Sequence, residues 1–453
     1  MKDSNATLLL GTEPIGKLLL RYSLPAIAAM VVFSLYNVID SIFIGHGVGP
    51  LAISGLAITF PVMNLTFALV MLVGIGGASI SSIRLGQQDM EGASRVLGNV
   101  LLLGLINGVG FGLGAQLVLD PVLRAFGASP ETLPYARDFM QIILLGFPSP
   151  APWFGLNHMM RATGYPHKAM LSAVVTVGVN IILARCSFLA ALGHPRGGYR
   201  YGALAVHGHV VGAAPFPEPA QQRPFPAGHL PLALEDRTQH LFHRHGPLLL
   251  NVCACFVVVL VNTGLKEHGG DLAIGAFGII NRVIIVFVMI VMGLTQGMQP
   301  IVGYNYGAQR IGRVRQTLRY GIIGGGLITT AGFLSGQFAP AFVSRLFTTD
   351  EALIALSVEG MRLVTLVFPL VGIQIVIGNF FQSIGKAKLS IFLSLTRQLL
   401  FLVPCLILLP RAFGLDGIWL SLPLSDVLSF VTTMAVLFVF SREMRRMHAA
   451  QEQ

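Results

Sequence analysis

The residue of this chain best placed to do chemistry is Asp40, within the stretch SLYNVIDSIFIGHG from Ser34 to Gly47. Between Arg21 and Arg84 it is the only formal charge, in an apolar run too long for a soluble core helix. A carboxylate at membrane depth is costly unless it faces a polar partner, water or an ion, which favours a functional role. The structural alternative is a protonated Asp40 that bonds to a neighbouring helix through Tyr36 or Asn37.

The composition of the chain indicates whether this apolar run lies in water or in a membrane. Hydrophobic residues make up 54% of the 453 residues and charged residues 11%, and mean hydropathy is +0.72. These values predict an all-α polytopic membrane protein. The net charge of +10 suits basic loops at a membrane surface. We expect no nucleic-acid partner, because no basic stripe interleaved with aromatic residues is present. Four cysteines lie in apolar surroundings without metal-ligand spacing, so no metal site is expected.

Charge-poor runs of about 20 residues or more mark the expected membrane spans. They lie at residues 16–44, 51–83, 96–119, 135–160, 166–189, 247–265, 272–303, 318–342, 358–383, 388–409 and 415–440. The first run follows Asp3 and Glu13 and has no short apolar region with a cleavage site, so we expect it to stay in place as an uncleaved anchor.

Loop charges orient these spans. Basic residues fall on one side: Lys17, Arg21, Arg84, Arg95, Arg161, Lys168, Arg310, Arg313, Arg315, Arg319, Lys386, Lys388, Arg442, Arg445 and Arg446. The alternate loops carry acids instead: Asp120, Glu131, Glu267, Asp271, Asp350, Glu351 and Asp416. By the positive-inside tendency both termini are predicted to be cytoplasmic. This arrangement needs an even number of spans, so a twelfth is missing from the eleven runs.

The chain also repeats itself. Five separated matches share one spacing of 221 positions, as Leu51 and Leu272 show. The others pair Leu85–Gln88 with Tyr306–Gln309, Arg124 and Phe126 with Arg345 and Phe347, Phe147-Pro148 with Phe368-Pro369, and Gly164 with Gly385. We therefore expect two similar six-helix halves, related by an axis along the membrane normal.

Residues 185–246 do not fit this pattern. The window contains seven of the twelve histidines and the proline-rich runs PFPEP and RPFP, through which no transmembrane helix can be built. The repeat nevertheless places the sixth helix here. Three explanations stay open: a metal-binding insert with the H-x-x-H-x-H spacing from His240, a linker between lobes, or a local shift of reading frame. We favour the frame shift, because an insert would lengthen the chain and the length here is kept. We therefore expect an N-terminal lobe at 1–184, the anomalous segment at 185–246 and a C-terminal lobe at 247–453.

Three stretches carry a resemblance to a known family: YNVIDSIFIG from Tyr36, LTQGMQPIVGYNYGAQ from Leu294 and FFQSIGKAK from Phe380. They resemble the multidrug and toxic compound extrusion (MATE) family, near its bacterial multidrug efflux branch. The resemblance implies twelve helices in two six-helix lobes around a central cleft, in a bacterial inner membrane. It also implies the export of amphipathic, often cationic drugs in exchange for H+ or Na+. It implies no cofactor, no enzymatic activity and a monomer that works within the lipid bilayer.

The resemblance also implies roles for single residues. Asp40 matches the carboxylate that the family uses for cation coupling, and Asn157 and Asn180 resemble amides lining the same pocket. Two acids of relatives are replaced, by Ala184 and Asn251, so Asp40 would carry coupling largely alone. A lone buried Asp suits H+ better than Na+, which needs several oxygen ligands.

Other polar residues in the spans complete the candidate pocket. Gln296 begins the family-like motif, and Gln374 and Asn379 lie in the repeat of the Asn157 stretch. Arg282 and Arg397 are charges in apolar spans, and we expect Arg282 to face water.

The function predicted from the sequence is therefore multidrug efflux by alternating access. A lipid-linked saccharide flippase is the alternative, but it would need more cations for a pyrophosphate than Arg282 and Arg397 supply. A membrane-embedded enzyme is disfavoured, because no Ser/Lys, paired-Asp or H-E-x-x-H constellation is present.

Overall fold

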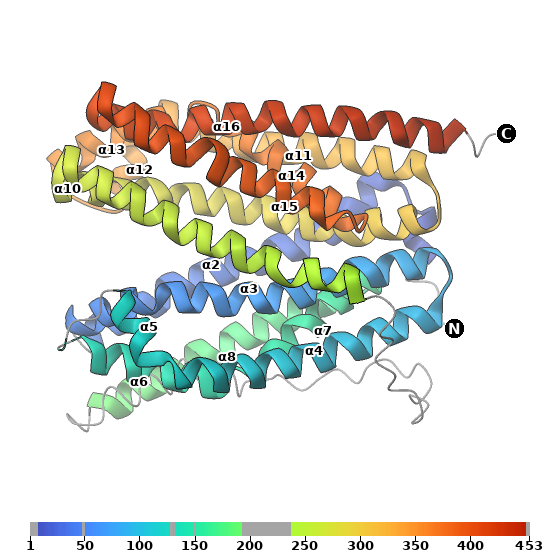
Figure 1. Ribbon diagram of the computed structural model, residues 1–453, viewed down its shortest axis with the longest axis horizontal. Helices are drawn as coiled ribbons and strands as arrows, with labels where there is room; N and C mark the ends of the chain where they lie inside the picture. Colours follow the sequence, from blue (N-terminus) through green and yellow to red (C-terminus); the bar gives the residue numbers. More distant parts are fainter. Residues whose placement is uncertain are drawn as a thin grey trace. The chain divides into compact units, whose positions relative to one another are not determined.

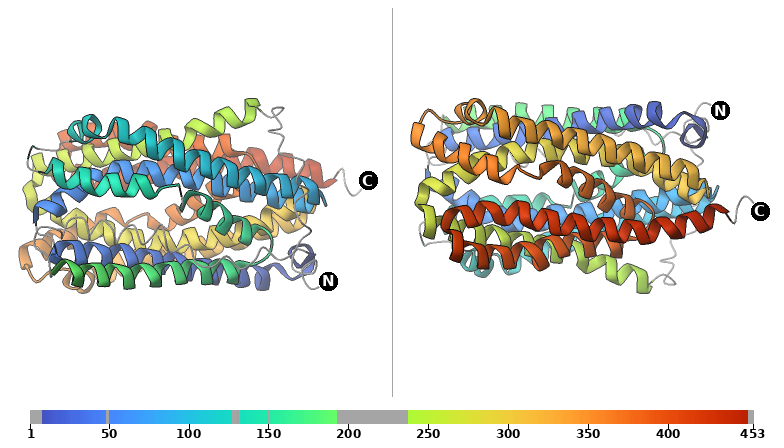
Figure 2. Two further views of the ribbon diagram at one scale, coloured as in Figure 1. Left: turned by 90° about the horizontal axis from the view of Figure 1, so that it is seen from below. Right: turned by 90° about the horizontal axis from the view of Figure 1, so that it is seen from above.

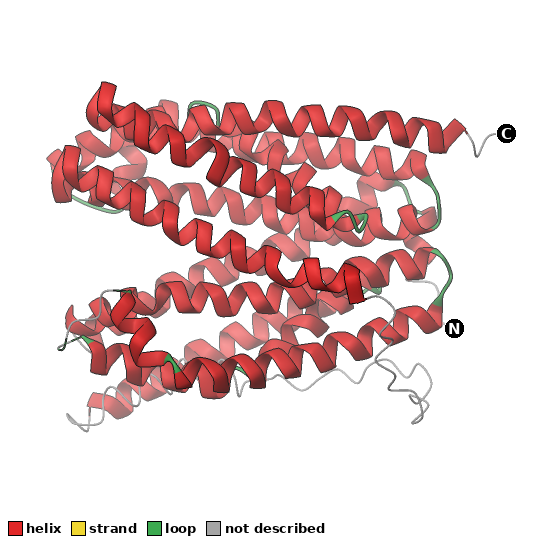
Figure 3. Cartoon of the chain, viewed as in Figure 1, coloured by secondary structure: helices red, strands yellow, loops and turns green. Residues whose placement is uncertain are grey.

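The structure is a computed structural model. It describes the backbone of residues 8–47, 50–126, 130, 132–148, 150–192 and 237–449. The side chains of residues 35–58, 180–192 and 237–252, and of some single residues elsewhere, lie outside this description. Every regular element in the described ranges is a helix (Figure 3). By length and apolar composition, five of these helical stretches could cross a membrane, or seven if each bent pair counts as one span. The predicted all-α, multi-pass membrane protein is confirmed.

The chain divides into two compact units. The N-terminal unit comprises Met1–Leu10 and Val31–Arg244, and the C-terminal unit comprises Gly11–Met30 and His245–Gln453. The helix α2 (Ile15–Gly47) therefore contributes its first half to the C-terminal unit and its second half to the N-terminal unit. This division differs from the boundaries expected from the sequence, because it assigns the start of the first span to the C-terminal unit.

In the N-terminal unit, α4 packs closely against α6 and α7, two short helices that form a bent pair (Figure 2). The helices after α2 are α3 (Pro50–Gly86), α4 (Met90–Leu117), α5 (Leu119–Ala125), α6 (Leu133–Gly146), α7 (Pro150–Ala162) and α8 (Pro166–Leu192). Gly104, Gly108 and Gly112 recur one turn apart on α4. A Cβ atom on Gly108 would lie 2.6 Å from the Cα atom of Pro148. Small residues at this spacing let two helix backbones approach closely in a membrane.

The C-terminal unit contains two long helices, each broken at one glycine. Its helices are α10 (Arg237–Gly307), α11 (Ile311–Phe338), α12 (Pro340–Arg345), α13 (Glu351–Val364), α14 (Phe368–Ser383), α15 (Ala387–Leu395), the π-helical turn η2 (Thr396–Leu402) and α16 (Val403–Ala449). In Figure 1, α11, α14 and α16 run lengthwise through this unit. The breaks lie at Gly270 (φ 65°) and Gly414 (φ 56°), a left-handed conformation that glycine adopts without a steric penalty.

These breaks separate spans that the sequence predicts as distinct. Each of the eleven predicted spans falls on described helices. Most match one helix, a bent pair or one side of a glycine break, whereas 388–409 covers α15, η2 and the start of α16, and 318–342 runs from α11 into α12. The boundaries differ in places: α4 starts at Met90 and α11 at Ile311, each about two turns earlier than expected. Charged residues such as Glu91 and Arg313 extend these helices beyond the apolar run, since a helix need not end where hydrocarbon ends.

The internal repeat is present in the backbone geometry. The bent pairs α6–α7 and α13–α14 both turn by 55°, next to Pro148 and Pro369. Positive φ angles recur at the predicted spacing, with 62° at Gln88 and 61° at Gln309. Gly164 and Gly385, the pair singled out in the sequence, also have positive φ angles. The two units therefore share turns as well as helices.

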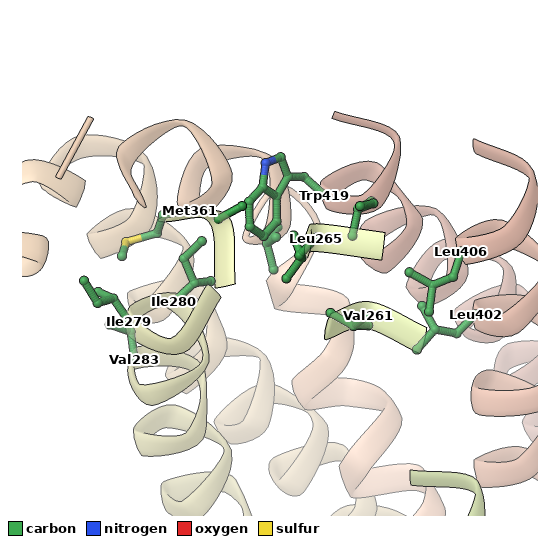
Figure 4. Close-up of a cluster of buried hydrophobic side chains, with 12 residues drawn as sticks. Val261, Leu265, Ile279, Ile280, Val283, Met361, Leu402, Leu406 and Trp419 are labelled. Carbon is green, nitrogen blue, oxygen red and sulfur yellow. The ribbon is translucent and has the colours of Figure 1, made fainter. Parts of the chain in front are cut away.

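Aliphatic side chains and one tryptophan form the largest described core of the C-terminal unit. Trp419 is fully buried there beside Leu265, Ile280 and Met361 (Figure 4). The cluster joins both sides of the Gly270 break to α13 and α16. The position of the breaks is thus fixed by packing as well as by glycine.

The anomalous window from 185 to 246 lies largely outside the described residues. The helix α8 extends to Leu192 and α10 begins at Arg237, and residues 193–236 between them are not described. The absence of a sixth helix, and the metal, linker and frame-shift explanations, stay predictions.

Candidate functional site

Asp40 lies on α2, in the half of this helix that belongs to the N-terminal unit. Tyr36 is four residues earlier, so the helical backbone places both residues on one face. Asn37, three residues before Asp40, lies on the same face of the helix. The side chains of all three lie outside the described residues. The backbone thus provides a continuous helix through the predicted coupling residue.

Asn157 lies on α7 and is buried, with 4% of its surface exposed. Its Nδ2 atom donates to the backbone oxygen of Ala169 and to Ser172 Oγ, both at 2.8 Å. These bonds join α7 to α8 within the N-terminal unit. Asn180, the second predicted amide, also lies on α8, but its side chain is outside the described residues. The described contacts of Asn157 are those of a residue that connects two helices.

Two further buried residues of α7 lie close to Asn157 in the chain. His158 and Arg161 are 2% and 6% exposed, although Arg161 was expected at the membrane surface as part of a basic loop. His158 packs on α3, where a Cβ atom on Gly74 would lie 2.9 Å from its ring. Arg161 occupies the last turn of α7, where a cation interacts favourably with the helix dipole.

In the C-terminal unit, Gln296 lies on α10 and faces the first half of α2. It is 7% exposed, and its Nε2 atom lies 3.5 Å from Met30 Sδ. Its Oε1 atom is buried without a hydrogen-bond partner among the described residues. A buried amide oxygen without a partner is unusual and marks a place where a ligand, an ion or water can bind. Arg282, on the same helix, has an exposed side chain.

The predicted pair on α14 makes two kinds of contact. Gln374 is buried, and its Nε2 atom donates to the backbone oxygen of Asp426 at 2.6 Å. Asn379 donates from Nδ2 to the backbone oxygen of Ile375, one turn earlier on its own helix, at 3.0 Å. Gln374 therefore connects α14 to α16, whereas the side-chain amide of Asn379 is used locally.

An ion pair that the sequence analysis missed lies beside Gln374. Arg397 Nε on η2 donates to Asp426 Oδ1 on α16 at 2.7 Å. Asp426 is the only buried acid among the side chains that the structure describes. The sequence did contain a signal, because Asp426 is the only formal charge between Asp416 and Arg442. The same observation had drawn attention to Asp40.

The described residues contain no cluster of three or more histidine, cysteine, aspartate or glutamate side chains suited to a metal ion. The candidate residues fall into two groups, one in each unit. The first contains Asp40 with Asn157 and Asn180, and the second contains Gln296 with Gln374 and the Arg397–Asp426 pair. The first group can supply a carboxylate and amides within membrane-spanning helices, and the second adds the guanidinium group of Arg397.

Comparison with known proteins gives consistent results. A family model described as MatE matches two stretches, residues 25–185 and 247–407, one in each half. The multidrug export protein MepA of Staphylococcus aureus (strain N315) is 24% identical over 443 residues, covering 94% of each chain.

Solved structures match over nearly the whole chain. The MATE multidrug transporter DinF-BH, solved in complex with a ligand, is 34% identical, with a TM-score of 0.83, and the match covers 94% of this chain and 96% of that one. An outward-facing multidrug resistance MATE family transporter of the MOP superfamily is 23% identical, with a TM-score of 0.85 and 99% of each chain covered. At that identity the second likeness supports the fold alone.

Proposed function

Because this chain belongs to the MatE family of membrane transporters, we propose that it exports amphipathic, cationic drugs in exchange for H+ or Na+. Two relatives support the substrate class. MepA is named a multidrug export protein, and DinF-BH is named a multidrug transporter. Alternating access is the mechanism that the repeated helices support.

Asp40 is the proposed coupling residue, and its isolation in the sequence is the observation that carries the proposal. It is the only formal charge between Arg21 and Arg84, on a helix that runs unbroken from Ile15 to Gly47. A carboxylate at membrane depth is costly unless it faces a partner, water or a transported ion, so a carboxylate that binds and releases a cation suits this position. H+ is the preferred coupling ion, since Na+ requires several oxygen ligands.

Transport follows from the protonation state of this residue. With Asp40 charged, a cationic drug can bind from the cytoplasm, and protonation from outside removes the charge that attracts it. Drug and proton then compete for one carboxylate, which makes their exchange obligatory. We propose that the protein works in this way as a monomer in a bacterial inner membrane, with both termini in the cytoplasm.

The test is transport of the fluorescent cation rhodamine 6G by inverted membrane vesicles, with H+ and Na+ gradients imposed separately. Asp40→Asn removes the proton-binding group and keeps its size, so we expect it to abolish gradient-driven uptake. Asp416→Asn is the matched control, because Asp416 is exposed next to the Gly414 break. The control should transport at the wild-type rate. Wild-type transport by Asp40→Asn, at equal protein in the membrane, would contradict the coupling role of Asp40.

A further inference from the structure

Arg397 lies deep within a membrane-spanning stretch. At about 1.5 Å per residue, it is about 15 Å from Ala387, where α15 begins, and about 24 Å from Phe413, before the Gly414 break. Neither end is close enough for the guanidinium group to reach a lipid headgroup along its own helix. Charged side chains at such depth face the protein interior or water and mark functional positions.

Among the described residues, only one nitrogen of this guanidinium group makes a hydrogen bond. Its Nε atom donates to Asp426 Oδ1 at 2.7 Å, and its Nη1 and Nη2 atoms have no partner among the described residues. The Asp426 side chain is buried, with 8% of its surface exposed, whereas the Arg397 side chain is 38% exposed. The guanidinium group is therefore accessible to a ligand and the carboxylate is not. A guanidinium group can therefore offer a pair of parallel N–H donors to a second planar acceptor.

The position of the guanidinium group is fixed from two directions. Asp426 holds Nε, and Gln374 holds the backbone of Asp426 through the bond from Nε2 to the backbone oxygen. Arg397 itself lies in the π-helical turn η2, a feature that occurs frequently at functional sites. Three elements, α14, η2 and α16, thus fix the group before any ligand arrives. Such preorganisation lowers the entropy cost of binding.

We propose that Arg397, oriented by Asp426, binds the carboxylate of an amphipathic substrate through Nη1 and Nη2. This inference rests on the proposed drug transport and extends it to zwitterions, whose cationic part offsets the charge of Asp426. The paired donors of a guanidinium group match the two oxygens of a planar carboxylate in geometry. A lysine ammonium group has no such pair of parallel donors. The depth of Arg397 favours a mobile amphipath over the phosphate of a bilayer lipid.

The test uses two dyes that differ in one group. Rhodamine 19 carries a free carboxylate, and rhodamine 6G is its ethyl ester, so their aromatic parts bind alike. Binding to purified protein is measured by fluorescence anisotropy, which requires no transport. Arg397→Lys keeps a charge opposite Asp426 but loses the paired donors. It should weaken rhodamine 19 binding about ten-fold, the effect of one charge-assisted contact, and leave rhodamine 6G binding unchanged.

Two further variants make the test independent of folding. Arg397→Gln combined with Asp426→Asn removes both charges at nearly constant size and should show the same selective loss. Arg411→Lys is the control for the substitution itself, because Arg411 is exposed on α16 outside this cluster. An equal loss for both dyes, or no loss for either, would overturn the carboxylate site. Wild-type protein that binds rhodamine 6G and not rhodamine 19 would overturn it while the proposed function stands. Failure to bind either dye would defeat the proposed function.

Discussion

Gly297 of α10 lies directly against the backbone of Ser23 in α2, where a Cβ atom on the glycine would be 2.5 Å from the Ser23 Cα atom. One turn earlier, Gly293 is equally close to the Cα atom of Ile27. Ser23 Oγ also donates to the backbone oxygen of Leu294 at 3.3 Å. The first half of α2 is therefore part of the C-terminal unit, whereas Asp40 lies in the half assigned to the N-terminal unit.

We expect Gly297→Ala to destabilise the protein, because the added methyl group would displace a backbone that cannot yield as a side chain can. Overpacking of this kind costs about 1 to 3 kcal/mol. Gly278→Ala, on the same helix with nothing within 4 Å of its Cβ position, is the control. It should be neutral or slightly stabilising, since alanine favours helix. Thermal unfolding in detergent compares the two, and equal midpoints would contradict close packing at Gly297.

A second prediction concerns the start of α2. Arg313 Nη2 donates to the backbone oxygen of Glu13 at 2.6 Å, and its Nε atom donates to Asn305 Oδ1 at 3.0 Å. Lysine cannot make both bonds, so Arg313→Lys should loosen the first turn of the helix. A cysteine at Ile15, a position only 2% exposed, should then react faster with maleimide.

Arg315→Lys, an exposed neighbour with the same change, is the control for this labelling. The native cysteines are replaced by serine in all variants. If the Ile15 cysteine reacts at the same rate in both, Arg313 does not hold the start of α2.

A third prediction separates two roles for Asn157. Its amide joins α7 to α8 through Ala169 and Ser172, so Asn157→Leu should leave the backbone oxygen of Ala169 without this donor. The loss is about 0.5 to 1.5 kcal/mol of stability, the net contribution of one hydrogen bond, because the backbone oxygen of Ala169 still accepts from Ser172 Oγ at 2.9 Å. Ser172→Ala removes one of the two acceptors and should cost less. The affinity of the folded fraction for rhodamine 6G should be unchanged, and a selective loss of affinity without loss of stability would return Asn157 to the drug pocket.

Features that depend on the residues along a single helix could be predicted from the sequence. Apolar length placed the spans, and a constant spacing anticipated the matching turns at Gln88 and Gln309. The Arg397–Asp426 pair was out of reach, because its partners are 29 positions apart and meet only through the register of η2 and α16. The division of α2 between units was likewise hidden, since nothing in its composition changes near Met30. Gln374 was identified as a candidate, but its partner is a backbone oxygen, which no residue pattern encodes.

The last prediction tests the orientation of both units and the missing span together. Single cysteines are introduced at Glu91, Arg315 and Glu351 in a background without native cysteines, and labelled from each side of the membrane. Basic residues surround the first two positions, and an acid precedes the third. The positive-inside tendency therefore places Glu91 and Arg315 in the cytoplasm and Glu351 outside.

This result needs an even number of crossings between Glu91 and Arg315. The described helices between these positions provide α4, the bent pair α6–α7, α8 and the stretches of α10 on either side of Gly270. The sequence predicts these as five crossings, so both cysteines face the cytoplasm only if residues 193–236 add a sixth, which the proline-rich sequence of 185–246 is predicted not to form as a helix. External labelling at Arg315 with cytoplasmic labelling at Glu91 would show that they add none.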